Sequence, residues 1–164
     1  MRHSLLVAVP VVAIAAWMLW PVDERELVRH LPMRAATAFS AGHISDCLDA
    51  FDAEFSDDSD GRRIDRETIR AALLGALRGR GDAGLVARVE DETAIVDEFD
   101  ATAGTARVRC EVALSRVSPG ARYVAAADEI WTVAIDASLR RADDGTWRFV
   151  RAEHRTLSGQ APYR

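Results

Sequence analysis

The chain contains no lysine: all 21 of its basic residues are arginines, set against 26 acidic residues in a length of 164. Its formal net charge of -5 at pH 7 argues against a general attraction to nucleic acid, because nucleic-acid-binding domains carry basic faces or stripes. It also lacks G-x-S-x-G, Walker A and G-x-G-x-x-G motifs, so no serine-hydrolase or nucleotide-binding signature is present. These features predict one domain with one core, no nucleic-acid partner and no cofactor.

Metal-ligating residues are also scarce. The four histidines form no H-x-x-x-H pair of the kind that holds zinc. The two cysteines, Cys47 and Cys110, belong to no C-x-x-C motif. We interpret them as small buried hydrophobic residues. A disulfide between them is the alternative, which an oxidising compartment would permit.

One acidic stretch, FSDDSDGRRIDRE, has the spacing of a calcium-binding EF-hand loop. Read from Ser56, it puts Asp58 and Asp60 at loop positions 3 and 5 and a glutamate at position 12. However, Ser56 stands where the first carboxylate ligand belongs, and two arginines lie inside the loop. Asp65 is a suitable N-cap for the helix after the loop. We therefore predict a polar turn leading into a helix, and no metal site.

The N-terminus carries the longest apolar run. Residues 4–20 contain no charge, Arg2 precedes them and acidic residues come after them. Seventeen apolar residues are near the minimum for a membrane-spanning helix, and the preceding positive charge favours export of the rest of the chain. We predict that residues 1–22 are a transmembrane anchor or a signal peptide, with the domain on the periplasmic or extracytoplasmic side. The alternatives are secretion after signal cleavage at Ala13-Ile14-Ala15 and a buried helix of a soluble protein.

The next part of the chain has helical periodicity. Residues 23–31 predict a juxtamembrane helix, and Pro32 can begin a second helix that ends before Gly42. Apolar residues at i, i+3, i+4 and i+7 predict a short helix over residues 44–51. A third helix begins after Asp65, with a buried stripe formed by Ile69, Ala72, Leu73, Ala76 and Leu77.

From Gly84 onward the apolar period changes from 3.6 to 2. Alternating residues predict strands in TARVRCEVALSRV and IWTVAIDASL, with less regular strands over residues 85–99 and 146–156. Turn signals separate them at Thr102-Ala103-Gly104, Ser118-Pro119-Gly120 and Asp143-Asp144-Gly145. Helices succeeded by strands predict an α+β fold, with three helices on one face of a four-stranded antiparallel meander.

This order of elements resembles the NTF2-like superfamily, which includes nuclear transport factor 2, SnoaL-like cyclases and ketosteroid isomerase. The similar segments are AFSAGHISDCLDAFDAEFSDD, DRETIRAALLGAL and the hairpin RRADDGTWRFVRAEH. The resemblance covers residues 32–157 and leaves 158–164 as a tail. It implies a cone-shaped α+β fold with a pocket between the helices and a curved sheet. The isomerase pattern has a tyrosine seven residues before the glycine that corresponds to Gly42, where this chain has Ala35.

The candidate site residues come from that expected pocket. His154 is the best lone acid–base candidate, because histidine titrates most readily near neutrality, and Asp58 is the candidate acid. Phe39, Trp131 and Trp147 are candidate pocket residues. The alternatives are an exposed or structurally hydrogen-bonded histidine and ordinary core aromatics.

The sequence favours a membrane-tethered, exported domain that binds a protein partner or a small apolar ligand without catalysis, with homodimerisation through the sheet. This layout is similar to that of assembly components of secretion machines. Two alternatives remain open: a SnoaL-like isomerase, dehydratase or hydrolase that uses His154 and an acid, and a carrier of lipids or small molecules. Two convergent polar side chains would favour the enzyme.

Overall fold

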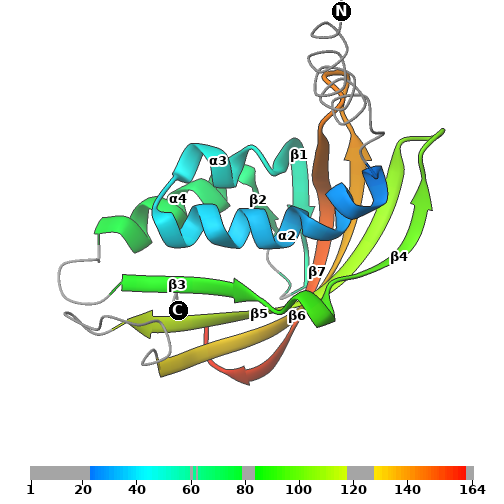
Figure 1. Ribbon diagram of the computed structural model, residues 1–164. Coiled ribbons are helices and arrows are strands. Elements are labelled where there is room, and N and C mark those ends of the chain that lie inside the picture. The colour runs from blue at the N-terminus through cyan, green and yellow to red at the C-terminus, as the bar shows by residue number, and fades with distance from the viewer. Residues whose placement is uncertain (1–22, 60, 62, 79–83, 118–127, 162–164) are drawn as a thin grey trace, which may run out of the picture.

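Three α-helices lie on one side of a curved, mixed sheet of seven strands (Figure 1). The computed structural model describes residues 23–59, 61, 63–78, 84–117 and 128–161. The helices are α2 (Glu24–Ala41), α3 (Ile44–Leu48) and α4 (Arg66–Arg78), with a short 3-10 helix, η2 (Asp91–Thr93). The strands are β1 (Phe51–Asp57), β2 (Ile64–Asp65), β3 (Gly84–Val89), β4 (Ile95–Asp100), β5 (Thr105–Val117), β6 (Asp128–Arg141) and β7 (Trp147–Gly159).

The sheet has the order β2-β1-β7-β6-β5-β3, and β4 pairs with the other half of β5. The long strands β5, β6 and β7 form the predicted antiparallel meander. Beside it, β1 runs parallel to β7, so the prediction of a four-stranded, wholly antiparallel sheet was wrong. Strand β7 also continues to Gly159, into the residues expected to form the tail.

Three additional strands account for the difference. The strand predicted over residues 85–99 is divided by η2 into β3 and β4, and β1 and β2, which lie before α4, were not predicted. Ile44, Cys47, Leu48 and Phe51 fit one helical stripe, but α3 ends at Leu48 and Phe51 begins β1. All four side chains nevertheless pack into or against the same apolar cluster with Leu73. A pattern of four apolar residues is too short to separate one helical turn from the strand next to it.

Helix α2 is continuous through Pro32, so the predicted division into two helices at this residue was also wrong. Asp23 caps its first turn by accepting a hydrogen bond from the Arg25 backbone N–H at 2.9 Å. Gly42, with φ 77°, ends it as predicted. Proline inside a helix costs about 3 kcal/mol, and here Pro32 is one of the buried residues of the helix.

Helix α4 begins as predicted. The Asp65 side chain accepts hydrogen bonds from the Thr68 backbone N–H and hydroxyl, both at 2.8 Å. These bonds lower the pKa of the Asp65 carboxyl. Leu73 is buried and Ile69 packs against the core, while the side chains of Ala76 and Leu77 lie outside the described residues.

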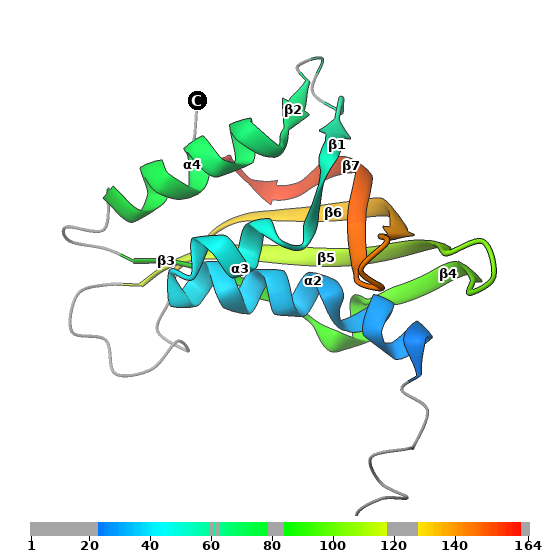
Figure 2. The same ribbon diagram turned by 90° about the horizontal axis from the view of Figure 1, so that it is seen from above.

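The core lies between the helices and the concave face of the sheet. In β5 and β6 the predicted alternation is confirmed, with Val108, Ala137 and Leu139 nearly inaccessible to solvent. Seen from above (Figure 2), α2 runs beside β3 and β4, whereas α4 lies near β1 and β2. The predicted turns at Gly104 and Gly145 are present, and each glycine has a positive φ. The turn predicted at 118–120 lies outside the described residues.

Side chains of α2 hold the backbone of the outer strands of the sheet. Arg25 donates to the Val96 carbonyl at 3.0 Å and Arg29 to the Ala94 carbonyl at 3.3 Å. At the other end of the helix, the Ser40 hydroxyl lies 2.9 Å from both the N–H and the carbonyl oxygen of Ala87. Val96 and Ala87 belong to the rim strands β4 and β3, and Ala94 directly precedes β4. The contacts thus occupy backbone groups along the rim of the sheet.

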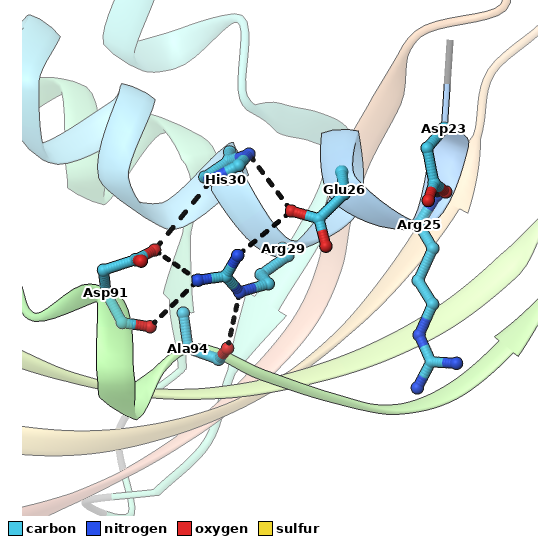
Figure 3. Close-up of polar contacts among 7 residues, drawn as sticks. All are labelled: Asp23, Arg25, Glu26, Arg29, His30, Asp91 and Ala94. Carbon is cyan, nitrogen blue, oxygen red and sulfur yellow. Dashed lines mark hydrogen bonds and ion pairs between the residues drawn. The ribbon is translucent and has the colours of Figure 1, made fainter. Parts of the chain in front are cut away.

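A cluster of charged residues, which we call the α2–η2 cluster, reinforces this attachment (Figure 3). The Arg29 guanidinium contacts Glu26 at 3.0 Å and Asp91 at 2.5 Å. His30 lies 3.8 Å from Glu26 and 3.9 Å from Asp91. The hydrogen bond from Arg29 to Glu26, the largest cause, and the charges of both acids raise the pKa of the guanidinium.

No helix in the described part of the chain is both long and apolar enough to cross a membrane. The predicted anchor or signal segment, residues 1–22, lies outside the described residues. It therefore stays a prediction from the sequence.

Candidate functional site

The candidate site lies where β1 ends against β7. Asp57 is the last residue of β1 and pairs in register with Ala152 of β7. Because strand side chains alternate between the faces of a sheet, His154 lies on the same face as Ala152, whose side chain belongs to the main core cluster. The parallel pairing of β1 and β7 thus brings together two residues that are 97 positions apart in the sequence.

Asp57 and His154 form a short, largely buried contact. The Nδ1 atom of His154 lies 2.7 Å from Oδ2 of Asp57, and each side chain is 10% exposed. Among the described residues, Asp57 is the one buried residue with a charged side chain. Burying a carboxylate is costly unless hydrogen bonds compensate it, so its partners determine whether this arrangement is stable.

Ser59 supplies the remaining hydrogen bonds that the structure shows for this carboxylate. Its backbone N–H donates to Oδ1 of Asp57 at 2.8 Å, and its hydroxyl donates to the same oxygen at 2.5 Å. The same hydroxyl accepts the backbone N–H of His154 at 2.6 Å. Both oxygens of Asp57 are therefore engaged, and the carboxylate is held in one orientation.

Trp131, on β6, forms part of the surroundings of His154. The two rings meet edge to face, with centroids 6.2 Å apart and an interplanar angle of 84°. The indole N–H of Trp131 donates to the Thr156 hydroxyl at 3.1 Å, which fixes the ring. His154 therefore has a carboxylate on one side and a large, half-buried aromatic wall on another.

This arrangement can transfer protons. A histidine whose Nδ1–H donates to a carboxylate carries its basic lone pair on Nε2 in the neutral form, because the hydrogen bond selects that tautomer. The carboxylate also stabilises the imidazolium that forms when Nε2 accepts a proton. A buried His–Asp pair is thus suited to general acid–base catalysis.

The structure places the sequence-predicted residues in three different environments. His154 belongs to the pair, while Asp58 is exposed and its neighbour Asp57 takes the position beside the imidazole. Trp131 contacts His154, whereas Trp147 is buried in the main core and packs against Phe99. Phe39 packs against the separate cluster of Cys47, Leu48 and Leu73.

Asp57 is the residue that sequence reasoning did not select. The signal was its spacing from Phe55: in a strand, residues i and i+2 share a face, and both of these are buried. Because FSDDSDGRRIDRE reads as a polar loop, this alternation was hidden. One carboxylate in a run of four aspartates could be chosen only once β1 was known to extend to Asp57.

The other candidate features do not form sites in the described part of the chain. No group of three or more His, Cys, Asp and Glu side chains there could hold a metal ion; Asp60 of the calcium-like stretch lies outside it. Cys47 and Cys110 are buried and free, as interpreted from the sequence. Burial raises the pKa of the Cys47 thiol to about 11 and that of the Cys110 thiol to about 12, so neither is an activated nucleophile.

Two surface hollows lie away from the pair. One, of about 580 Å³, is lined at the β6–β7 turn by residues that include Asp52, Arg140 and Arg148. Its arginines face acids, with Arg140 3.3 Å from Asp52 and Arg148 2.5 Å from Asp144. The other, of about 630 Å³, crosses β4, β5 and β6. Neither is lined by a residue of the pair.

No family model and no curated protein matches the chain, but solved structures do. An NTF2-like protein with a cystatin-like fold from Novosphingobium aromaticivorans is 23% identical, with a TM-score of 0.64 over 90% of each chain. A proposed scytalone dehydratase from the same organism is 16% identical, with a TM-score of 0.63 over 82% of this chain and 85% of its own. A ketosteroid isomerase-like protein from Erwinia carotovora atroseptica is 14% identical, with a TM-score of 0.58 over 84% and 99%.

These similarities confirm the predicted resemblance at the level of the fold. The chain has the α+β fold of NTF2-like proteins, with three helices packed on a curved mixed sheet. At these identities the neighbours carry no residue roles to this chain.

Proposed function

We propose that this protein is an acid–base enzyme in which His154 exchanges protons with a small organic substrate and Asp57 holds its imidazole. The observation that carries the proposal is the 2.7 Å contact between two side chains that are each 10% exposed. Exposed histidine–carboxylate contacts are common and weak. A buried pair with every carboxylate oxygen engaged is preorganised for proton transfer.

The reaction type that fits best is isomerisation or dehydration next to a carbonyl group. Nε2 of His154 would remove a proton from the carbon beside the carbonyl, leaving an enolate. The imidazolium would then return that proton to another carbon of the substrate, which isomerises it, or to a departing hydroxyl group, which leaves as water. His154 thus serves as the base in the first step and as the acid in the second.

Other parts of the structure are consistent with an organic substrate. The half-buried Trp131 beside His154 offers an aromatic surface for a flat or apolar molecule. The fold is shared with proteins described as a proposed scytalone dehydratase and as ketosteroid isomerase-like. That likeness supports the reaction class and no particular substrate.

The sequence alone favoured a binding domain, because no two acid–base groups could be shown to meet. The meeting of Asp57 and His154 is what favours the enzyme. We keep an extracytoplasmic location as part of the proposal. It rests on the uncharged run at residues 4–20 and the arginine before it.

The test uses the full chain and a probe that reports proton abstraction directly. Deuterium uptake at the carbons beside the carbonyl of 2-tetralone, an enolisable aromatic ketone, would be followed by proton NMR in D₂O. We expect the wild type to accelerate uptake, and His154→Ala to reduce that acceleration by about 10²-fold or more. Asp57→Asn should also reduce it, because an amide oxygen cannot stabilise the imidazolium as a carboxylate does.

The chain offers a matched control for each variant. Asp58→Asn changes the adjacent, exposed carboxylate, and His43→Ala changes an exposed histidine before α3. Both should leave uptake unchanged. Equal rates in the wild type and in folded His154→Ala, or no acceleration by the wild type, would contradict the proposal.

A further inference from the structure

The hydroxyl of Ser59 touches both members of the pair through different atoms. It donates to Oδ1 of Asp57 at 2.5 Å and accepts the backbone N–H of His154 at 2.6 Å. Asp57 is the last residue of β1 that pairs with β7, opposite Ala152. Ser59 therefore engages a backbone N–H of β7 just beyond that last pair, with a side-chain oxygen in place of a strand carbonyl.

A local turn explains only part of this arrangement. The bond from the Ser59 backbone N–H to Oδ1 of Asp57 spans two residues, as in any Asx-turn. The bond from the His154 backbone to the Ser59 hydroxyl spans 95 residues and crosses from the turn to another strand. A turn alone has no need of that second contact.

We propose that Ser59 is the positioning residue of the pair: its hydroxyl fixes the Asp57 carboxylate and the His154 backbone relative to each other. This inference rests on the proposed function for its catalytic consequence, but its structural content can be tested separately. A hydroxyl group has one proton. Because the oxygen accepts from the His154 N–H, its own proton is directed to Oδ1 of Asp57, and Oδ2 is left to face the imidazole.

The consequence is control over the imidazole tautomer. With Oδ1 held by two donors, the carboxylate presents Oδ2 to Nδ1 of His154 and keeps the proton on that nitrogen. Without the hydroxyl, the Asp57 carboxylate can rotate about its last single bond, and the backbone N–H of His154 loses its hydrogen bond to Ser59. The ring should then populate the other tautomer, whose basic lone pair lies on Nδ1.

The primary experiment measures the tautomer directly, by ¹⁵N NMR of the His154 ring in the full chain, assigned by its loss in His154→Ala. Ser59→Ala should shift the ring from the Nδ1–H form toward the mixture seen in free histidine. Ser59→Thr keeps the hydroxyl and should restore the wild-type spectrum. Ser59→Val has the shape of threonine without the hydroxyl and should behave as Ser59→Ala. Ser45→Ala, which removes an exposed hydroxyl on α3, is the control for serine loss elsewhere.

Uptake of deuterium by 2-tetralone provides the second readout. Ser59→Ala should slow it about tenfold, the effect of one hydrogen bond to a charged group, and Ser59→Thr should recover it. A tautomer unchanged in folded Ser59→Ala and Ser59→Val, but changed in Asp57→Asn, would overturn the role of Ser59 while leaving the pair intact. If the His154 tautomer depends on the Ser59 hydroxyl but the wild type does not accelerate deuterium uptake, the positioning role of Ser59 is supported and the proposed function is rejected. A tautomer that even Asp57→Asn does not change would reject both.

Discussion

Two of the histidine–carboxylate clusters in the described part of the chain differ in distance and in burial. In one, His154 meets Asp57 at 2.7 Å, with both side chains 10% exposed. In the α2–η2 cluster, His30 lies 3.8 Å from Glu26 and 3.9 Å from Asp91, and its side chain is 46% exposed. Each cluster places a histidine beside a carboxylate, but only in the first are both side chains largely withdrawn from solvent.

The comparison shows why composition alone cannot identify a site. Charges near the surface interact through water and are screened by salt, so their contacts are weak and adjustable. Inside the fold the same groups must be paired, and the pairing fixes their geometry. The exposed cluster attaches a helix to the sheet (Figure 3), whereas in the proposed function the pair of Asp57 and His154 holds the imidazole for proton transfer.

The largest contrast is expected in activity. His154→Ala should remove about 10²-fold or more of the acceleration of deuterium uptake by 2-tetralone, while His30→Ala should change it little. Both variants remove one histidine, so loss of a titratable group is matched. Circular dichroism would establish that each is folded. An equal loss of acceleration in His154→Ala and His30→Ala would show that the two histidines do not differ in their contribution to activity.

Removing the Asp57 carboxylate should destabilise the fold more than removing the Asp91 carboxylate. Asp57→Ala leaves partly buried donors of Ser59 and His154 without this acceptor, which should cost about 1–3 kcal/mol of unfolding free energy. Asp91→Ala should leave the urea midpoint nearly unchanged, because exposed ion pairs contribute little. Urea titrations of the full chain, monitored by tryptophan fluorescence, measure both. A shift for Asp91→Ala as large as that for Asp57→Ala would contradict the assignment of burial.

Salt should sharpen the comparison further. Arg29→Ala removes ion pairs to Glu26 and Asp91 together with the hydrogen bond to the Ala94 carbonyl. We expect a modest fall in melting temperature that shrinks as sodium chloride rises from about 0.05 M to about 1 M, since salt screens exposed charges. The melting difference for Asp57→Ala should depend much less on salt. Salt dependence of equal size would show that the pair is accessible to solvent.

The smallest effect is expected at an exposed carboxylate with a structural role. The pKa of the Asp65 carboxyl is lowered from its usual 3.8, mainly by the hydrogen bond from the Thr68 backbone N–H and next by that from the Thr68 hydroxyl. A lowered folded-state pKa gives stability that is present above the unfolded pKa and is lost as the pH falls through the folded one. Asp65→Asn keeps an N-cap and should be slightly less stable than the wild type at about pH 6, with the gap closing toward about pH 3. A stability difference between the wild type and Asp65→Asn that grows as the pH falls would contradict a lowered pKa for Asp65.

Much of the fold can be read from local sequence signals. The alternation in β5 and β6, the turns at Gly104 and Gly145, and the Asp65 cap depend on residues close in sequence, and all were predicted correctly. The helix break predicted at Pro32 was wrong. Proline lacks the N–H that a helix uses for hydrogen bonding, but packing of the helix outweighs this loss. Val28, Leu31 and Ala36 on the same helix are all buried, and their burial favours a continuous helix over a break.

The site was only half predictable. His154 could be selected, because a histidine in a strand is a recognisable acid–base candidate. Its partner could not be, since Asp57, Asp58 and Asp60 lie in one polar stretch, and the spacing of Asp57 from Phe55 is informative only once β1 is known to reach Asp57. The choice is made by the parallel pairing of β1 with β7 and by the phase of the strand. Both are long-range properties, and Ser59 enters only through a contact spanning 95 residues.

The attachment of α2 to the rim of the sheet has a consequence for self-association. An outer strand with open backbone groups is a template on which another chain can add a strand, and this is a route to aggregation. Here Arg25, Arg29 and Ser40 already occupy backbone groups of Val96, Ala94 and Ala87. Because the same helix contacts the backbone of both β3 and β4, displacing α2 would expose backbone groups of both strands. The helix therefore hinders strand addition at this edge of the sheet as well as covering the core.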